Sequence, residues 1–348
     1  MKIGNFKLGQ GSVFVIAEIG ANHGGEISIA KRTIDAAKKA GADAVKLQTY
    51  TADTITLNSK KDDFIIKGGT LWDGRKLYDL YEEAHLPWEW HEELFSHARK
   101  IGLDIFSSPF DKSAVDFLEK FSPTAYKIAS FEITDYELIR YVASKQKPVI
   151  ISTGVATLQE IQDAVDICRS EGNKNIALLK CTSAYPAPLE DANLKMLPIL
   201  SESFGVVAGF SDHTQGVVAP IVAVTLGAMI VEKHFVLDKT VESADSAFSM
   251  NQHDFKEMVD SIRIAEKVVG RVDFSMSDKK KESRQFCRSL YVSEDIEIGE
   301  PFTDKNIRSV RPGFGVHPKY LKNLMGRISN NKYELGDRLG PNEFGEAL

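Results

Sequence analysis

Two histidines, His213 and His234, are the residues whose types and placement suggest metal chemistry. Each comes directly after an apolar run that is typical of a buried strand, within Ser211-Asp212-His213 and Glu232-Lys233-His234. Two imidazoles beside open coordination positions suit Mn²⁺ or Zn²⁺, and also Mg²⁺ if water and substrate oxygens supply the other ligands. The sequence therefore predicts a divalent-metal site, with a pair of structural histidines as the alternative.

Two lysines, Lys46 and Lys127, also lie in candidate strands, and serines end several others. Ammonium groups supply point charges and hydroxyls add neutral donors, so together they could hold a small phosphate or carboxylate. The serines concerned are Ser130, Ser152, Ser183 and Ser211. A solvated cationic rim is the alternative interpretation of the same residues.

Short β-branched or apolar runs recur through the first two thirds of the chain, each followed by a turn and a segment with helical spacing. We expect eight strands, at Val13–Ala17, Ala44–Gln48, Asp104–Ser107, Ala125–Ile128, Val149–Ser152, Ile176–Lys180, Val206–Phe210 and Met229–Lys233. Helices are expected at Ser28–Ala40, Trp90–Lys100, Thr157–Ser170, Val217–Leu226 and His253–Val269. Eight alternating strand and helix units favour a (β/α)8 TIM barrel.

An open, doubly wound parallel sheet is the alternative architecture. Its nucleotide-binding versions lose support, because no G-x-G-x-x-G follows the first strand and no G-x-x-x-x-G-K-[ST] occurs anywhere. In a barrel, the loops after the strands converge on one mouth, where the chemistry lies. Closure at the first strand would bring His213 and His234 near Glu18.

The alternation of side chains along a strand puts Lys46 with Gln48 on one face, and likewise Glu232 with His234. Each pair can therefore point into the mouth of the barrel. A lysine at a strand end is often solvated, and a serine often caps the next helix. That simpler interpretation would have to hold at all eight strand ends, so an active site is favoured.

The helical pattern ends near Val269, and the chain then divides into a linker and a small module. We expect a barrel domain over residues 1–270, a solvated linker over 271–286 that carries Lys279-Lys280-Lys281, and a compact domain over 287–348. Short strands are expected near Ser289–Val292 and Arg308–Val310. A module this small has a marginal core, which docking on another surface, such as a second subunit, would stabilise.

Composition excludes several classes of protein. The 348 residues carry 43 Lys and Arg against 49 Asp and Glu, and a net charge of −6 does not suggest a nucleic-acid partner. Three cysteines without C-x-x-C spacing argue against a disulfide framework and for a reducing cytoplasm. No signal peptide is expected, because the start, Met1–Asn5, has no long apolar core. No membrane span is expected, because the longest apolar run, Val217–Val231, is short and contains Pro220, Thr225 and Gly227.

With these residues in place, the chain resembles the sialic acid synthase family, enzymes that condense phosphoenolpyruvate with an N-acylated sugar. The resemblance rests on segments in the family's order. They are Ala17-Glu18-Ile19-Gly20-x-Asn22-His23-x-Gly25, Val45-Lys46-x-Gln48-Thr49, Tyr126-Lys127-Ile128-x-Ser130-x-Glu132, Ser152-Thr153-Gly154, Cys181-Thr182-Ser183-x-Tyr185-Pro186, Ser211-Asp212-His213-Thr214 and Glu232-Lys233-His234-Phe235. The tail, with Arg288-Ser289 and Arg311-Pro312-Gly313-x-Gly315, resembles the family's antifreeze-like (SAF) domain.

Within the family, three segments resemble the pseudaminic acid branch, whose acceptor is 2,4-diacetamido-2,4,6-trideoxy-L-altrose. They are Gly69–Tyr81, Pro87–Trp90 and Pro312–Leu321. Without the resemblance, the aromatic-rich loop after the second strand could only be called a lid or a packing element. The sialic acid branch carries Asn where this chain has Ser183, and synthesis of legionaminic or N-acetylneuraminic acid is the close alternative.

The resemblance also implies roles for individual residues. His213 and His234 would bind a divalent metal such as Mn²⁺ or Mg²⁺. The carboxylate and phosphate of phosphoenolpyruvate would be held by Lys46, Ser108, Lys127, Ser130, Ser152, Ser183 and Ser211. The sugar would face Glu18, Gln48, Glu132, Tyr185 and Asp245, and Arg311 would arrive from the partner's tail in a domain-swapped homodimer.

The expected chemistry is attack of C3 of the enol phosphate on the open-chain aldehyde, addition of water at C2, and loss of phosphate with C–O cleavage. A divalent cation would polarise the aldehyde oxygen. Glu132 would act as a base or stabilise a cationic C2, and Glu18 would orient the sugar. A carboxylate among lysines tends to have a lowered pKa, which weakens a base, so the sequence leaves both roles of Glu132 open.

Two functions of other classes remain open on the sequence alone. A Schiff-base aldolase would use Lys180, which ends the sixth strand, or Lys127. A carbohydrate-binding or ice-binding protein would keep its function in the tail, although it leaves the polar strand ends unexplained.

Overall fold

The computed structural model describes residues 1–69, 72–241, 243–340 and 343. The chain divides into two compact units, Met1–Gly270 and Arg271–Leu348. Within the second unit, Asp278–Ser283 (α11) is helical and Arg284–Phe286 forms a 3-10 turn. The assignment of residues 271–286 as a linker stays a prediction, and Thr70 and Leu71 of the predicted acceptor-loop segment lie outside the described residues.

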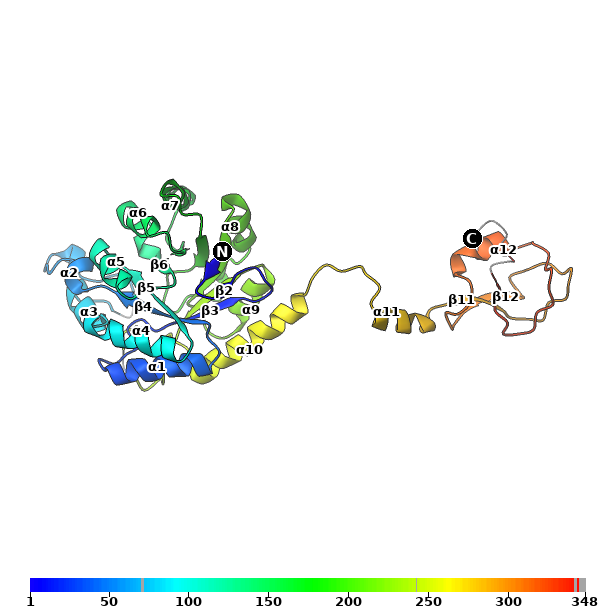
Figure 1. The fold of residues 1–348 in the computed structure, drawn as a ribbon, viewed down its shortest axis with the longest axis horizontal. Coiled ribbons are helices and arrows are strands. Elements are labelled where there is room, and N and C mark those ends of the chain that lie inside the picture. Colours follow the sequence, from blue (N-terminus) through cyan, green and yellow to red (C-terminus); the bar gives the residue numbers. More distant parts are fainter. Residues whose placement is uncertain (70–71, 242, 341–342, 344–348) are drawn as a thin grey trace. The chain divides into compact units, whose positions relative to one another are not determined.

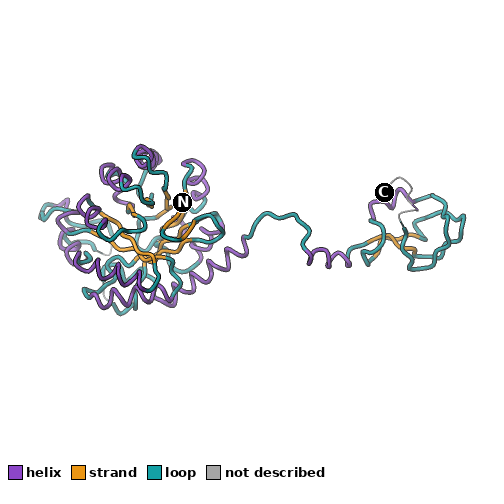
Figure 2. The backbone as a smooth tube through the Cα atoms, in the orientation of Figure 1, coloured by secondary structure: helices purple, strands orange, loops and turns teal. Residues whose placement is uncertain are grey.

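In the described residues of the first unit, eight parallel strands form a closed barrel (Figures 1 and 2). This confirms the predicted (β/α)8 fold. Pairing of the last strand with the first closes it, with His234 opposite Glu18. The strands are β3 (Phe14–Glu18), β4 (Ala44–Thr49), β5 (Asp104–Pro109), β6 (Tyr126–Ile128), β7 (Val149–Ser152), β8 (Ile176–Cys181), β9 (Val207–Asp212) and β10 (Ile230–His234). Each starts within a residue of its predicted position.

Helices surround the strands (Figure 2). They are α1 (Ile27–Lys39), α4 (His91–Lys100), α5 (Lys112–Glu119), α6 (Tyr136–Ser144), α7 (Leu158–Ser170), α8 (Met196–Phe204), α9 (Val218–Thr225) and α10 (Gln252–Val269). In α7, Thr157 and Glu160 form a capping box, and buried Ile161, Val165 and Cys168 form one face. These local signals explain why the helices predicted from spacing are found.

The interior of the barrel is apolar at the end where the strands begin. Inward side chains such as Phe14, Phe106 and Ile150 form one buried cluster. A short hairpin, β1 (Lys2–Ile3) and β2 (Phe6–Lys7), adds Ile3 to this cluster, although no strand was predicted there. With that end filled, the polar inward residues gather where the strands end.

A long connection between β4 and α4 lies beside this polar end. It contains α2 (Ala52–Ile55), a 3-10 turn at Asp62–Phe64, α3 (Leu77–Ala84) and a 3-10 turn at Trp88–Trp90. A β-bridge joins Ile65 to Lys76 and gives the connection a fixed shape. Its apolar side chains line the pocket described below.

The second unit has its own small core beside two antiparallel strands, β11 (Ser289–Val292) and β12 (Ile307–Val310). A 3-10 turn at Pro318–Tyr320 leads into α12 (Leu321–Leu324). The core comprises Leu290, Val292, Ile296, Phe302, Ile307, Leu324 and Leu339. Both predicted strands of the module are confirmed.

All three cysteines, Cys168, Cys181 and Cys287, are free thiols. A helix long and apolar enough to cross a bilayer is absent from the described ranges.

Candidate active site

The strand register brings three predicted site residues together on the inner face of the barrel. Glu18 of β3 pairs with Lys46 of β4 on one side and with His234 of β10 on the other. All three side chains are buried. The polar strand ends expected to meet at the mouth therefore do so.

Lys46 is the cation at the centre of this cluster. Its Nζ lies 2.6 Å from Glu18 Oε2, 3.4 Å from Glu232 Oε1 and 3.4 Å from Ser108 Oγ. Burial raises the pKa of Glu18 to about 7, although the ammonium of Lys46 opposes the shift. Gln48 Nε2 donates to Glu18 Oε1 at 3.0 Å, so the face shared by Lys46 and Gln48 is confirmed.

A cradle of hydroxyl groups lies beside the ends of β6, β7 and β8. The hydroxyls of Ser130 and Ser152 are buried and have no hydrogen-bond partner in the described structure. A Cβ built on Gly154 would approach the hydroxyl oxygens of Ser183 and Ser130 closer than 3.0 Å. Buried donors without partners are costly, so this space, which a glycine keeps open, suits an anionic ligand.

Lys127 and Ser211 complete the buried polar set. Lys127 is 1% exposed and its Nζ donates to the carbonyl oxygen of Ile128 at 2.8 Å, while burial lowers its pKa. The hydroxyl of Ser211 lies 3.5 Å from Glu232 Oε1. Glu232 Oε2 has no partner among the described residues. Two lysines thus share the barrel interior with buried carboxylates.

The two histidines converge as predicted, with ring centroids 5.3 Å apart. His213 Nδ1 lies 3.0 Å from the carbonyl oxygen of Thr182, which can only accept, so Nδ1 donates to it and Nε2 is the nitrogen that remains for a metal ion. His234 Nδ1 is buried without a hydrogen bond, and Asp245 Oδ2 lies 3.6 Å from it.

The same two rings decide whether a metal ion would fit. The described part of the chain contains no group of three or more His, Cys, Asp or Glu side chains placed so that they could hold a metal ion together. Two imidazoles with free nitrogens nevertheless fit a cation that takes its other ligands from water and substrate. Asp245 lies at their edge, and its carboxylate also accepts from the backbone N–H of Ala21 at 3.0 Å.

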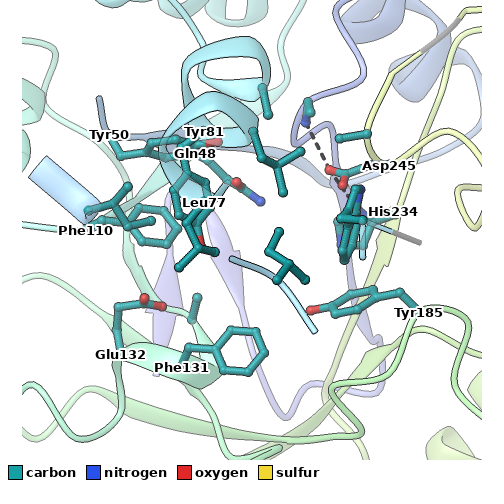
Figure 3. A pocket seen from close by; sticks show the side chains of 18 of the residues that line it. Gln48, Tyr50, Leu77, Tyr81, Phe110, Phe131, Glu132, Tyr185, His234 and Asp245 are labelled. Carbon is teal, nitrogen blue, oxygen red and sulfur yellow. Dashed lines mark hydrogen bonds and ion pairs between the residues drawn. The ribbon is translucent and has the colours of Figure 1, made fainter. Parts of the chain in front are cut away.

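A cavity of about 410 Å³ opens above these groups (Figure 3). Five predicted residues line it, namely Gln48, Glu132, Tyr185, His234 and Asp245. The remaining wall is mostly apolar and comes largely from the β4–α4 connection and nearby loops, with Tyr50, Ile55, Ile66, Trp72, Leu77, Leu80, Tyr81, Phe110, Phe131 and Phe248. Figure 3 shows Tyr185, His234 and Asp245 along one side, with Phe110 and Glu132 opposite.

The pKa of Glu132 corrects one expectation. Burial raises its pKa to about 7, and the opposing effect of the Lys127 charge is smaller. The expected lowering by neighbouring lysines is therefore wrong, because desolvation outweighs the Coulomb attraction at this position. Oε2 of Glu132 is buried without a partner, which leaves it open to a substrate proton.

Lys180 does not join this cluster. Its Nζ donates to the carbonyl oxygen of Cys181 at 2.6 Å and lies 3.4 Å from Thr182 Oγ1, while Cys181 Sγ faces His213 at 3.7 Å. Because neighbours alternate along β8, Lys180 points away from the barrel interior. Lys180 therefore cannot form a Schiff base with a substrate inside the barrel.

Arg311 lies in the second unit, directly after β12, and is exposed. The loop that follows is held against β11, because Ser289 Oγ donates to the carbonyl oxygen of Pro312 and accepts from the N–H of Gly315. A Cβ on Gly313 would approach the carbonyl oxygen of Arg284 closer than 3.0 Å, which explains the glycine in this loop. Arg311 is thus presented at the surface of its unit.

Two residues were not among the predicted site residues. Glu232 was only noted as sharing a face with His234, and the structure puts its carboxylate beside Lys46. Gly154 was quoted within a motif, and its role depends on the distances to Ser130 and Ser183. Alternation along β10 could have identified Glu232, whereas no signal in the sequence reveals the space at Gly154.

Fold and site define a (β/α)8 barrel with a polar pocket at the carboxyl ends of its strands. The sequence matches the NeuB family over residues 33–274 and the SAF domain over residues 288–336. The chain belongs to the NeuB family, and the resemblance to sialic acid synthases is confirmed.

Known relatives match most of this chain. The pseudaminic acid synthase of Campylobacter jejuni strain 81-176 is 51% identical over 344 residues, covering 99% of this chain and 100% of the relative. The pseudaminic acid synthase of Helicobacter pylori is 48% identical, with 96% and 98% covered. The N,N'-diacetyllegionaminic acid synthase of Legionella pneumophila is more distant, at 36% identity with 91% of each chain covered.

A solved structure agrees with the fold. The N-acetylneuraminic acid synthetase of Leptospira borgpetersenii, in complex with citrate, has a TM-score of 0.73 and 30% identity. The match covers 81% of this chain and 94% of that one.

Proposed function

We propose that this protein is a pseudaminic acid synthase. It condenses phosphoenolpyruvate with 2,4-diacetamido-2,4,6-trideoxy-L-altrose to give pseudaminic acid and phosphate, a transferase reaction that forms a C–C bond. The observation that carries the proposal is the similarity to two pseudaminic acid synthases over nearly the whole chain. The legionaminic acid synthase is a more distant relative, which favours the altrose acceptor.

Phosphoenolpyruvate occupies the buried polar end of the pocket. Lys46 and Lys127 supply the positive charges that its carboxylate and phosphate require. The neutral donors are Ser108, Ser130, Ser152, Ser183 and Ser211. The hydroxyls of Ser130 and Ser152, which lack partners, and the open space at Gly154 support this assignment.

The sugar occupies the wider cavity above. Gln48, Tyr185 and Asp245 offer the polar contacts, and aromatic and aliphatic side chains form most of the remaining wall. Glu18 does not line this cavity but accepts from Gln48, so it orients the sugar through that side chain. A trideoxy sugar with two acetamido groups carries three methyl groups, which gain from burial against such a wall. This wall therefore supports an acceptor less polar than an ordinary hexose.

His213 and His234 would hold a divalent cation, with Mn²⁺ and Mg²⁺ as the candidates. Such an ion, when bound, supplies Lewis-acid polarisation of a carbonyl oxygen. The free Nε2 of His213 and the unpartnered Nδ1 of His234 support this role.

The residues of this chain then orient the reactants and move protons. Lys46, Lys127 and the serines fix the enol phosphate so that C3 faces the aldehyde carbon and forms the new bond. The aldehyde oxygen gains a proton, and water adds at C2 and loses its first proton. The C2–O bond to phosphate then breaks as the C2 hydroxyl gives its remaining proton to the departing phosphate, which leaves the 2-keto group. Glu132 takes the proton from the water, because its raised pKa makes it a stronger base than an ordinary carboxylate.

Completion of the site from a second chain is part of the proposal. Following the family resemblance, the chain forms a domain-swapped homodimer in the cytoplasm, and Arg311 of one chain binds the sugar in the barrel of the other. A guanidinium suits this role because its fork of donors can hold two acceptor groups at once.

The test is to supply phosphoenolpyruvate with each candidate sugar and weigh the products by mass spectrometry. We expect the nonulosonate product from 2,4-diacetamido-2,4,6-trideoxy-L-altrose, loss of turnover with EDTA, and its return with Mn²⁺. Product from the legionaminic or N-acetylneuraminic acid precursor instead would reassign the acceptor. Trapping of a lysine adduct by borohydride, with turnover unchanged by EDTA, would support a Schiff-base aldolase.

A further inference from the structure

A buried ion pair lies on the outer face of the barrel, directly behind the two histidines. Lys233 of β10 and Asp212 of β9 are paired in register, and Lys233 Nζ lies 2.5 Å from Asp212 Oδ2. Their exposed fractions are 2% and 1%. Each immediately precedes one of the histidines, so the pair joins the two strands that carry them.

The same ammonium also binds the backbone after His213. Lys233 Nζ donates to the carbonyl oxygen of Thr214 at 2.7 Å and lies 3.4 Å from that of Gly216. Asp212 Oδ1 accepts from the N–H of Thr214 at 2.8 Å. We call the Lys233 ammonium, the Asp212 carboxylate and these two carbonyl groups the Lys233 clamp.

Nothing in the proposed reaction uses these groups, and a buried ion pair is weak evidence for stability alone. A surface position or an apolar pair would serve the packing of β9 against β10 equally well. The clamp instead restrains the backbone on both sides of His213 and ties it to the residue before His234. The spacing of the two imidazoles is therefore restrained through covalent neighbours.

We propose that Lys233 is a positioning residue that sets the spacing of His213 and His234 for a divalent cation. This inference rests on the proposed function, since it requires the two histidines to bind the metal. Groups that orient metal ligands from behind commonly change metal affinity about 10- to 100-fold when removed. Lys233→Met keeps a similar side-chain length and removes the charge with every donor of the clamp.

The experiment measures Mn²⁺ binding to the full chain without substrates, from the electron paramagnetic resonance signal of free Mn²⁺. We expect Lys233→Met to raise the dissociation constant at least about tenfold. The milder Asp212→Asn, which keeps one acceptor, should raise it by less and covers the case in which Lys233→Met does not fold. Thermal unfolding in EDTA reports the loss of stability separately.

Arg263→Met is the matched control. Arg263 forms a network of the same kind, although half-buried, at the other end of the barrel, with Asp43 at 2.8 Å, Glu266 at 2.7 Å and the carbonyl oxygen of Val13 at 2.7 Å. Its loss should lower the melting temperature and leave Mn²⁺ affinity at the wild-type value. If Lys233 has only a structural role, Lys233→Met should behave like Arg263→Met, with a lower melting temperature and unchanged Mn²⁺ affinity.

The outcomes separate the two proposals. If His234→Ala binds Mn²⁺ as tightly as the wild type, the metal site itself is wrong. If His234→Ala loses binding while folded Lys233→Met and Asp212→Asn stay within about twofold of the wild type, the metal site stands and the clamp is overturned. A selective loss of affinity in the clamp variants supports it.

Discussion

Lys46 Nζ lies 2.6 Å from Glu18 Oε2 inside the barrel, and the same ammonium lies 3.4 Å from Glu232 Oε1. One lysine therefore compensates two carboxylates in a buried site. A substrate anion held by Lys46 would join groups that are already ion-paired. The two functions of this lysine, balancing buried charge and binding the substrate, can be separated by mutation.

Replacing Lys46 with Met should destabilise the protein before any substrate is added. Removing one partner of a buried ion pair leaves an uncompensated charge, at a cost of about 3 kcal/mol. We expect a loss of at most that size in the free energy of urea unfolding at pH 8, because removal of the ammonium raises the pKa of Glu18 further and lets the carboxylate neutralise. The double variant Lys46→Met/Glu18→Gln should recover part of it, and equal destabilisation of both variants would argue against the charge-balancing role.

Gly154→Ala should interfere with the binding of phosphoenolpyruvate specifically. The added methyl group would approach the hydroxyls of Ser130 and Ser183 closer than 3.0 Å. If these hydroxyls rotate to avoid it, they no longer point toward the bound anion. Overpacking of this kind costs about 1–3 kcal/mol, which corresponds to a rise of roughly 5- to 150-fold in the KM for phosphoenolpyruvate.

Steady-state kinetics with each substrate varied in turn will check the Gly154 prediction, because the KM for the sugar should stay near the wild-type value. Gly154 does not have a positive φ, so alanine introduces no backbone strain. An equal rise in both KM values would mean that the cradle does not hold the enol phosphate.

Alternation along strands allowed much of this site to be predicted. The contacts of both Lys46 and Gln48 with Glu18 follow from their shared face, and the eight strands follow from their apolar runs. The hairpin formed by Lys2–Ile3 and Phe6–Lys7 was missed, because strands of two residues carry no periodicity.

Properties that depend on the packing of distant segments could not be predicted. The pKa of Glu132 depends on how completely the pocket excludes water, and local sequence reveals only the lysines nearby. The contact between Lys233 and Asp212 depends on the register of β10 against β9. The direction of Lys180 was within reach of the alternation rule, since its neighbour Cys181 faces His213.

The activity should fall in acid because Glu132 must be ionised to accept a proton. Burial raises its pKa to about 7, so its basic form is present above pH 7 and is lost as the pH falls. Below that pH, kcat should decrease roughly tenfold for each unit. Rates measured between pH 5 and pH 9 with saturating substrates will show this acid limb.

Two variants identify the group that causes the acid limb. Glu132→Gln should lower kcat at all pH values and flatten the limb, because no titrating base remains. Glu18 also has a pKa raised to about 7, so Glu18→Gln is the matched control and should keep the limb. If the limb disappears in Glu18→Gln and persists in Glu132→Gln, the base has been misassigned.

Arg311→Ala should weaken the use of the sugar while Mn²⁺ binding is retained. Loss of a hydrogen bond to a charged group costs about 1.5–3 kcal/mol, or roughly 10- to 150-fold in kcat/KM for the sugar. Arg311→Lys keeps the charge without the guanidinium fork and should restore only part of the activity. Wild-type kinetics for Arg311→Ala would exclude a role in the site.

Mixing two impaired variants, at a sugar concentration where each alone has little activity, tests whether Arg311 acts on the other chain of a dimer. A Lys46→Met chain has a defective barrel and an intact tail, whereas an Arg311→Ala chain has the reverse. If tails act across the dimer, a mixed dimer contains one complete site, formed by the barrel of the second chain and Arg311 of the first. Random exchange makes half of the dimers mixed, so activity should return to about a quarter of the wild-type value. If each tail serves its own barrel, every site in the mixture lacks one of the two residues, and the activity stays at the level of the separate variants.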